Sequence, residues 1–248
     1  GLSSSAAYEV AVGTIMNHFF CNDELDAVEI AKIGQYAENI YFGKPCGLLD
    51  QMAASVGGIV GVDFRNPEEP VVNKVAFDMS ASGYSLCIID TGGDHKELTG
   101  VYAAIPEEMG RIAKYFGETV LREVSQDEFM AELPNLREAC GDRAVLRAMH
   151  FFEENKRAVD ELKAVQEGRF DDFLKLVEAS GNSSAKYLQN VWSGISQERQ
   201  EIVVAIALAE SLLEGRGAVR VHGGGFAGTI QAFVPDDILK KFKRGIEK

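Results

Sequence analysis

The sequence has few of the residues that mark disulfide-stapled or zinc-binding proteins. Its four cysteines are widely spaced, at positions 21, 46, 87 and 140, and no two of them form a CxxC pair. Disulfide frameworks and zinc motifs normally show closer and more regular cysteine spacing. We therefore expect reduced thiols in a cytoplasmic protein.

Long apolar runs and a surplus of basic residues are missing as well. The best apolar run, residues 202–213, is interrupted by Glu210 and is shorter than the roughly 18 residues that a membrane helix needs. No signal-peptide pattern is visible. The 25 Lys and Arg face 38 Asp and Glu, a net charge of −13, so nothing is in excess to replace the counterions of a nucleic acid. We expect neither a membrane nor a nucleic acid as partner.

What the chain does contain suits a globular protein. Its 248 residues are 46% hydrophobic, with 25 Gly and 6 Pro, which excludes a disordered or collagen-like chain and suffices for one large core or two modest ones. Hydrophobic periodicity predicts helices and strands that do not alternate as βαβ units, which favours the α+β class. The expected helices are 6–20, 24–41, 48–56, 95–116, 137–166, 169–180 and 197–213, and the expected strands are 59–64, 71–77, 84–90, 218–221 and 229–234. A domain boundary is expected within residues 76–84.

A serine-rich loop, Gly1-Leu2-Ser3-Ser4-Ser5, leads directly into the first expected helix. Free backbone amides, the positive end of the helix dipole and several hydroxyl groups together suit a polyphosphate. The alternative is an ordinary helix that is capped by a serine.

A glycine-rich loop, residues 223–228, formally contains GxGxxG. A dinucleotide-binding fingerprint needs a helix after this motif, whereas residues 229–234 have the pattern of a strand. The loop therefore predicts either a close approach of backbone to a ligand or a tight hairpin.

Asp50 lies among apolar residues in the segment Pro45-Cys46-Gly47-Leu48-Leu49-Asp50-Gln51. An Asp at the start of a helix is usually a cap or a partly buried, satisfied residue, so this position alone proves nothing. Glu38 lies twelve residues upstream, near the end of an amphipathic helix, where an isolated Glu is normally solvated.

Taken together, these three segments resemble the second motif, the catalytic segment and the third motif of the GHMP small-molecule kinases, in that order. The similarity is greatest to the galactokinase branch, whose catalytic segment typically reads Cys-Gly-Ile-Met-Asp-Gln. It extends from Gly1 to about Val234, and Arg147-Ala148-Met149-His150 also resembles a galactokinase helix. The resemblance implies the two-domain GHMP kinase fold, with residues 1–80 in the N-terminal domain and 81–248 in the C-terminal domain.

The resemblance also implies a set of site residues. Gly1, Ser3, Ser4 and Ser5 would bind ATP, and Ser5 would bind Mg²⁺ together with Glu38, with Ser4 in place of Ser5 left open. Asp50 would be the catalytic carboxylate that faces the anomeric hydroxyl of the sugar. Tyr102 would contact the sugar, and the loop 223–228 would support the nucleotide site.

The implied reaction is ATP-dependent phosphorylation of D-galactose to galactose 1-phosphate. A GHMP kinase for another sugar and a non-catalytic sensor of ATP and sugar are the alternatives. The first motif of the family, with a catalytic Arg and the Glu, His and Asp that grip the sugar, would lie upstream of Gly1, so we expect this chain to be an inactive fragment by itself. The chain also departs from the family pattern at Ala227, in Tyr102-Ala103-Ala104-Ile105, which lacks arginines, and in Ser180-Gly181-Asn182-Ser183-Ser184.

Overall fold

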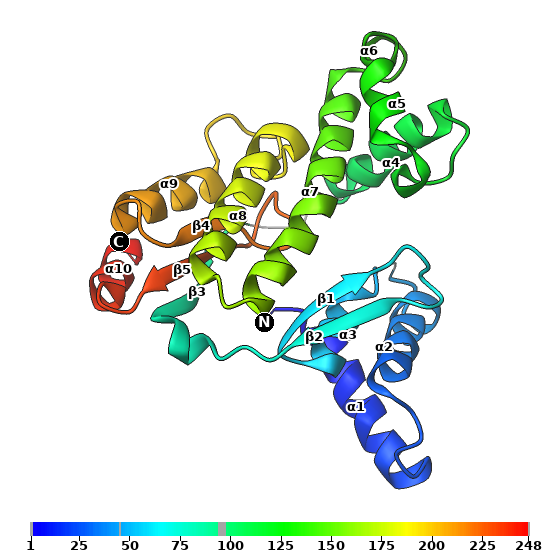
Figure 1. The fold of residues 1–248 in the computed structure, drawn as a ribbon, viewed down its shortest axis with the longest axis vertical. Coiled ribbons are helices and arrows are strands. Elements are labelled where there is room, and N and C mark those ends of the chain that lie inside the picture. Colours follow the sequence, from blue (N-terminus) through cyan, green and yellow to red (C-terminus); the bar gives the residue numbers. More distant parts are fainter. Residues whose placement is uncertain (1, 45, 94–97, 248) are drawn as a thin grey trace. The chain divides into compact units, whose positions relative to one another are not determined.

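The computed structural model describes residues 2–44, 46–93 and 98–247 (Figure 1). The chain divides into two compact units, Gly1–Phe77 and Asp78–Lys248, which are described separately below. None of the helices in the described residues combines the length and the apolar character that a transmembrane span requires. The assignment of residues 1–80 and 81–248 to the two GHMP kinase domains stays a prediction.

The first unit consists of a group of helices and a two-stranded antiparallel sheet. Its elements are α1 (Ser4–Phe20), α2 (Ala27–Tyr36), the π-helix η1 (Ala37–Tyr41), α3 (Leu49–Val56), β1 (Ile59–Asp63) and β2 (Val71–Val75). Asp26 starts α2 with a capping box, because its carboxylate accepts the amide of Glu29 while the Glu29 side chain accepts the amide of Asp26.

The core of the first unit forms where α2 and α3 pack together. Ala31 and Met52 are fully buried there, and apolar side chains of β1 and β2 cover the other side of this cluster. The strands are held in register with Ile59 opposite Val75, so that Val62 and Val72 reach the same core. This packing fixes the start of α3, which carries Asp50.

The second unit is built on a three-stranded antiparallel sheet of order β3-β5-β4. The strands are β3 (Tyr84–Asp90), β4 (Ala218–Val221) and β5 (Thr229–Pro235). The helices around them are α4 (Thr99–Tyr115), α5 (Gln126–Ala131), α6 (Leu133–Cys140), α7 (Asp142–Gln166), α8 (Phe170–Ser183), α9 (Glu201–Leu213) and α10 (Leu239–Ile246) (Figure 1). Short 3₁₀ turns at Met79–Ser82 and Leu121–Glu123 and the π-helix η4 (Ser184–Leu188) connect them.

Both faces of the central strand β5 are buried. Ile230, Ala232 and Val234 point toward the cluster that α9 and α10 complete, whereas Phe233 points toward the cluster that α8 completes. Alternate residues of a strand face opposite sides of a sheet, so the two helical layers lie on opposite faces. This double burial explains the apolar run Ala232-Phe233-Val234 within β5.

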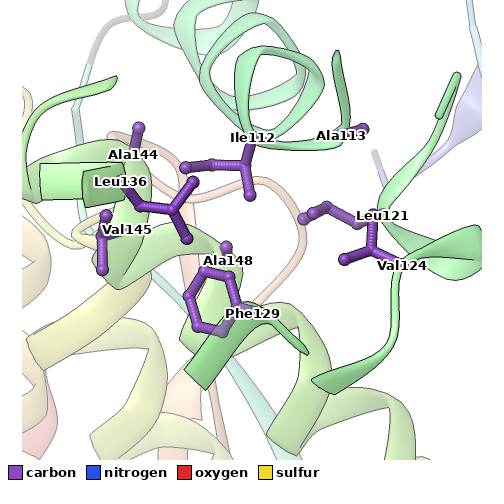
Figure 2. Close-up of a cluster of buried hydrophobic side chains, with 9 residues drawn as sticks. All are labelled: Ile112, Ala113, Leu121, Val124, Phe129, Leu136, Ala144, Val145 and Ala148. Atoms are coloured by element: carbon purple, nitrogen blue, oxygen red, sulfur yellow. The ribbon is translucent and has the colours of Figure 1, made fainter. Parts of the chain in front are cut away.

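A separate apolar cluster joins α4, α5, α6 and α7 (Figure 2). Phe129 and Leu136 are fully buried at its centre, and Ile112 of α4 and Ala148 of α7 pack on them. This cluster holds α4 against α7, and α4 is the helix that carries Tyr102.

The α+β class is confirmed, but one predicted helix is two helices. The helix predicted over 137–166 is broken at Gly141, which has φ 86° and separates α6 from α7. The helix predicted to begin at residue 95 begins at Thr99, with Leu98 at its N-cap, and residues 94–97 lie outside the described part. The short helix α5 was not predicted, since its six residues contain too little periodicity.

Candidate active site

The serine segment leads into α1, and the side chain of its N-cap residue does not cap the helix. Ser3 precedes the helix with φ 45° and makes no capping hydrogen bond. The amides of a first helical turn have no partner inside their own helix, and the helix dipole adds partial positive charge at that end. The interpretation of this segment as an ordinary serine cap is therefore wrong. Gly1, the remaining implied nucleotide contact here, lies outside the described residues.

The buried carboxylate of Glu38 accepts hydrogen bonds from three side chains. Glu38 is only 3% exposed, so the interpretation of this residue as a solvated surface Glu is wrong. Oε1 accepts hydrogen bonds from Ser5 Oγ at 2.9 Å and Lys44 Nζ at 2.5 Å. Oε2 accepts from Gln51 Nε2 at 2.9 Å. The hydrogen bond from Lys44 is the main cause that lowers the pKa of Glu38, against the effect of burial, so the group is a carboxylate at neutral pH.

The π-helix η1 turns Glu38 inward. It follows α2 directly and closes with a hydrogen bond from the Phe42 amide to the Ala37 carbonyl at 3.2 Å. The wider turn changes the face on which side chains emerge, and such turns are frequent at functional sites. Glu38 thereby meets Ser5, which is 33 residues away in the sequence.

Asp50 is exposed in the first turn of α3, beside the buried Gln51. It is not the cap of this helix, because Leu48 occupies the N-cap position and makes no side-chain capping bond. Within the described part of the chain, nothing donates a hydrogen bond to its carboxylate. Asp50 therefore has oxygen atoms available for a ligand.

The loop before Asp50 is tied to the helix that carries Glu38. Asn39 Oδ1 accepts the amide of Cys46 at 2.7 Å, and Gln35 Nε2 donates to the Cys46 carbonyl at 3.1 Å. Burial raises the pKa of the Cys46 thiol, so this group is a neutral packing residue and not a nucleophile. These bonds connect the loop that precedes Asp50 to the helical segment that carries Glu38.

In the second unit, the glycine loop 223–228 is a tight connection that packs on Tyr102. Tyr102 Oη donates to the Gly225 carbonyl at 2.6 Å, and its ring meets Phe226 edge-on at 5.3 Å. A Cβ on Gly224 would lie 2.9 Å from the Tyr102 ring, and one on Gly225 would lie 2.1 Å from the Asn190 carbonyl oxygen. Packing against Tyr102 and Asn190 thus explains why these two positions are glycine. Burial raises the pKa of Tyr102.

The chain is similar to known proteins along nearly its whole length. Residues 1–58, which contain Ser5, Glu38 and Asp50, match the family model of the GHMP kinases N terminal domain. A galactokinase of Actinobacillus pleuropneumoniae is 32% identical over 250 residues, which are 98% of this chain and 60% of that protein. A galactokinase of Haemophilus influenzae is 32% identical over 254 residues, with the same coverage of 98% and 60%. Residues 1–58 thus match the GHMP kinases N terminal domain, and nearly the whole chain is similar to galactokinases.

Solved structures confirm the GHMP kinase fold. A Lactococcus lactis galactokinase complexed with galactose superimposes with a TM-score of 0.72 at 26% identity, over 98% of this chain and 60% of that one. An L. major mevalonate kinase in complex with R-mevalonate has a TM-score of 0.61 at 16% identity, over 100% of this chain and 61% of that one, and shows the fold alone. The chain spans about 60% of the length of the galactokinases that it matches.

The departures from the family pattern have structural explanations in two places. Ala227 is not among the residues with positive φ, so its methyl group causes no backbone strain. A Cβ on Gly181 would lie 2.8 Å from Cβ of Arg220, so glycine lets α8 approach β4 closely. Ser180 beside it bonds to Glu154 and Arg220 in a buried polar network. Nothing in the structure explains the missing arginines after Tyr102.

Several polar residues of the candidate site were missed by sequence reasoning. Lys44 and Gln51 bond directly to Glu38, and Gln35 and Asn39 anchor the loop that carries Asp50. The one available signal was proximity, since Gln51 follows Asp50 directly. Among the described residues, no group of three or more His, Cys, Asp or Glu side chains could hold a metal ion. A metal here would take most of its ligands from nucleotide and water.

Proposed function

We propose that the protein phosphorylates D-galactose at its anomeric hydroxyl with ATP as the phosphoryl donor. The observation that carries this proposal is the contact of Ser5 with the buried Glu38, beside a loop that presents Asp50, whose carboxylate accepts no hydrogen bond from the described residues. The match to galactokinases, one of them solved in complex with galactose, supports the choice of sugar. The four unpaired cysteines support a cytoplasmic location.

Ser3, Ser4, Ser5 and the first-turn amides of α1 would bind the phosphates of ATP, together with Gly1. This end of α1 supplies hydroxyl groups and partial positive charge, which favour an anionic ligand without any basic surplus in the chain. Tyr102, which the resemblance implies as a sugar contact, stays a proposed substrate-binding residue.

The Ser5 hydroxyl and the Glu38 carboxylate fit a Mg²⁺ ion. Both are hard oxygen donors, the carboxylate is ionised, and they already converge within 2.9 Å of each other. When bound, the ion would neutralise charge on the phosphates during transfer. Ser4 stays the alternative hydroxyl ligand.

Asp50 is the proposed catalytic residue. Its carboxylate would orient the anomeric hydroxyl and accept the proton as the sugar oxygen forms a bond to the γ-phosphorus. The bond between that phosphorus and the bridging oxygen breaks, and ADP leaves with the electron pair. The tie of Cys46 to Asn39 would keep Asp50 in position.

The test is ADP release by the full-length protein with Mg-ATP and a panel of galactose, glucose, N-acetylgalactosamine, arabinose and mevalonate. A clear preference for galactose supports the proposal. A preference for another sugar keeps the kinase and overturns the substrate. Nucleotide binding without turnover on any of them overturns the proposal in favour of a sensor.

A further inference from the structure

Lys44 places an ammonium group on the carboxylate oxygen of Glu38 that also accepts the Ser5 hydroxyl. The Lys44 side chain is 65% exposed, whereas that of Glu38 is 4% exposed. A largely solvent-exposed lysine side chain thus places its ammonium group against a buried carboxylate. Lys44 is also tied through its backbone, because its amide donates to the Glu38 carbonyl at 3.1 Å. None of the site residues that the family resemblance implies includes Lys44.

The charge balance at Glu38 depends on this lysine. The other two donors on the carboxylate, Ser5 Oγ and Gln51 Nε2, are neutral. In the part of the chain that the structure describes, Lys44 makes the one salt bridge of Glu38. Without a cation there, the negative carboxylate would face the end of α1 at which we propose that phosphates bind, and like charges at that distance repel.

Lys44 is also able to leave Glu38. Its charge sits on a flexible four-carbon stem with three donors, and most of the side chain is in solvent. Because most of the stem is surrounded by solvent, the ammonium group can reach a second anion near Glu38 without displacing packed atoms.

From this juxtaposition we infer that Lys44 is a phosphate-binding residue that acts as the resident counter-cation of Glu38. Without a divalent metal ion, its ammonium group bridges the Glu38 carboxylate and the nucleotide phosphates. With a metal ion at Ser5 and Glu38, the ammonium group stays on phosphate oxygen alone. This inference rests on the proposed function, because it needs a nucleotide at the start of α1.

The test is the affinity of the full-length protein for ATP, by calorimetric titration, once with Mg²⁺ and once with EDTA. In Lys44→Met, the Kd in EDTA should rise about tenfold, the loss expected for one charge-assisted hydrogen bond. With Mg²⁺ the Kd should change less than about threefold, since removal of the competing ammonium from Glu38 offsets the lost phosphate contact. The dependence of ATP affinity on Mg²⁺ should thus increase.

Two further variants make the outcome decisive. Lys44→Arg keeps the positive charge and should retain most of the affinity in EDTA. Lys74→Met removes a lysine of the same unit whose ammonium group bonds to the Val56 carbonyl at 2.7 Å, and it should leave both affinities unchanged. If the Lys44→Met protein shows normal circular dichroism and an unchanged ratio of the two Kd values, the inference is overturned while the kinase proposal stands. Absence of ATP binding by the wild type under both conditions overturns both.

Discussion

The substitution Glu38→Gln tests whether the buried carboxylate stabilises the first unit through its charge. Gln has nearly the same shape as Glu, so the change removes the charge and little packing. At the Oε2 end, Gln51 would have to rotate its amide so that its oxygen accepts from the new amide group. That rotation is available, because Gln51 Oε1 is buried and has no partner among the described residues, but it breaks the weak contact of Gln51 Nε2 with Cys46 Sγ at 3.5 Å.

The main loss is at the Oε1 end, where Ser5 and Lys44 would donate to a neutral oxygen. Hydrogen bonds to charged groups contribute about 1.5–3 kcal/mol and neutral ones about 0.5–1.5 kcal/mol, so each bond loses about 1 kcal/mol. The contribution of Lys44 is discounted because its side chain is 65% exposed. We therefore expect the free energy of unfolding to fall by about 1–2 kcal/mol at neutral pH.

The effect should also depend on pH in a defined direction. The pKa of Glu38 is lowered in the folded state, chiefly by Lys44, from an ordinary value of 4.5. The stabilisation is therefore complete above that value and is lost as the pH falls through the depressed pKa. Urea unfolding followed by circular dichroism at about pH 7 and about pH 3 measures the difference between wild type and variant at both values.

The matched control is Glu24→Gln, an exposed acid of the same unit, which should change the free energy of unfolding by less than about 0.5 kcal/mol. A difference for Glu38→Gln that stays the same at both pH values would refute the reasoning, because a charge effect must vanish when the carboxyl is protonated. So would a loss at neutral pH no larger than that of the control.

Three more outcomes are expected. Asp50→Asn should lower kcat by about 10²-fold or more and leave the Kd of ATP within about twofold, as measured by ADP release and calorimetry; equal loss of both would show that Asp50 is structural. Gly225→Ala, with φ 80° and a Cβ position 2.1 Å from the Asn190 oxygen, should lower the free energy of unfolding by about 2 kcal/mol or more in urea titration. Gly223→Ala, with φ 69° and no atom within 4 Å, should cost about 1 kcal/mol, and equal costs would contradict the packing explanation. Burial raises the pKa of Glu161 to about 7, so its contribution to stability should be lost as the pH rises from about 4.5 to about 7, and urea titration over that range should show wild type losing stability relative to Glu161→Gln.

The fold could be predicted as far as local patterns extend. Periodicity located most helices and strands, and the strand pattern after the glycine loop correctly predicted β5. It overlooked the break at Gly141, because the apolar spacing on both sides stays helical and a single glycine does not show its φ in the sequence. It also could not foresee the π-helix η1, whose wider turn has no periodicity of its own over five residues.

The candidate site was predicted for a different reason. Ser5, Glu38 and Asp50 were named because the order of the motifs resembles a family, whereas each residue alone had an ordinary structural interpretation. The structure brings Ser5 and Glu38 together and leaves Asp50 exposed, but it adds Lys44 and Gln51 to the same carboxylate. Polar partners of this kind follow no periodicity, so no local sequence pattern predicts which residues will bond to Glu38.

By itself, the sequence determined the fold class, the order of its motifs and the residue types that carry chemistry. These properties depend on side-chain identity and on spacing along a few turns of helix or strand, which the linear chain records. Only the tertiary structure decided that Glu38 is buried, that its charge is balanced by Lys44, and that the glycine loop is shaped by Tyr102. Those properties arise when segments 33 or 123 residues apart pack together, and the packing sets both the desolvation of a charge and the donor that compensates it.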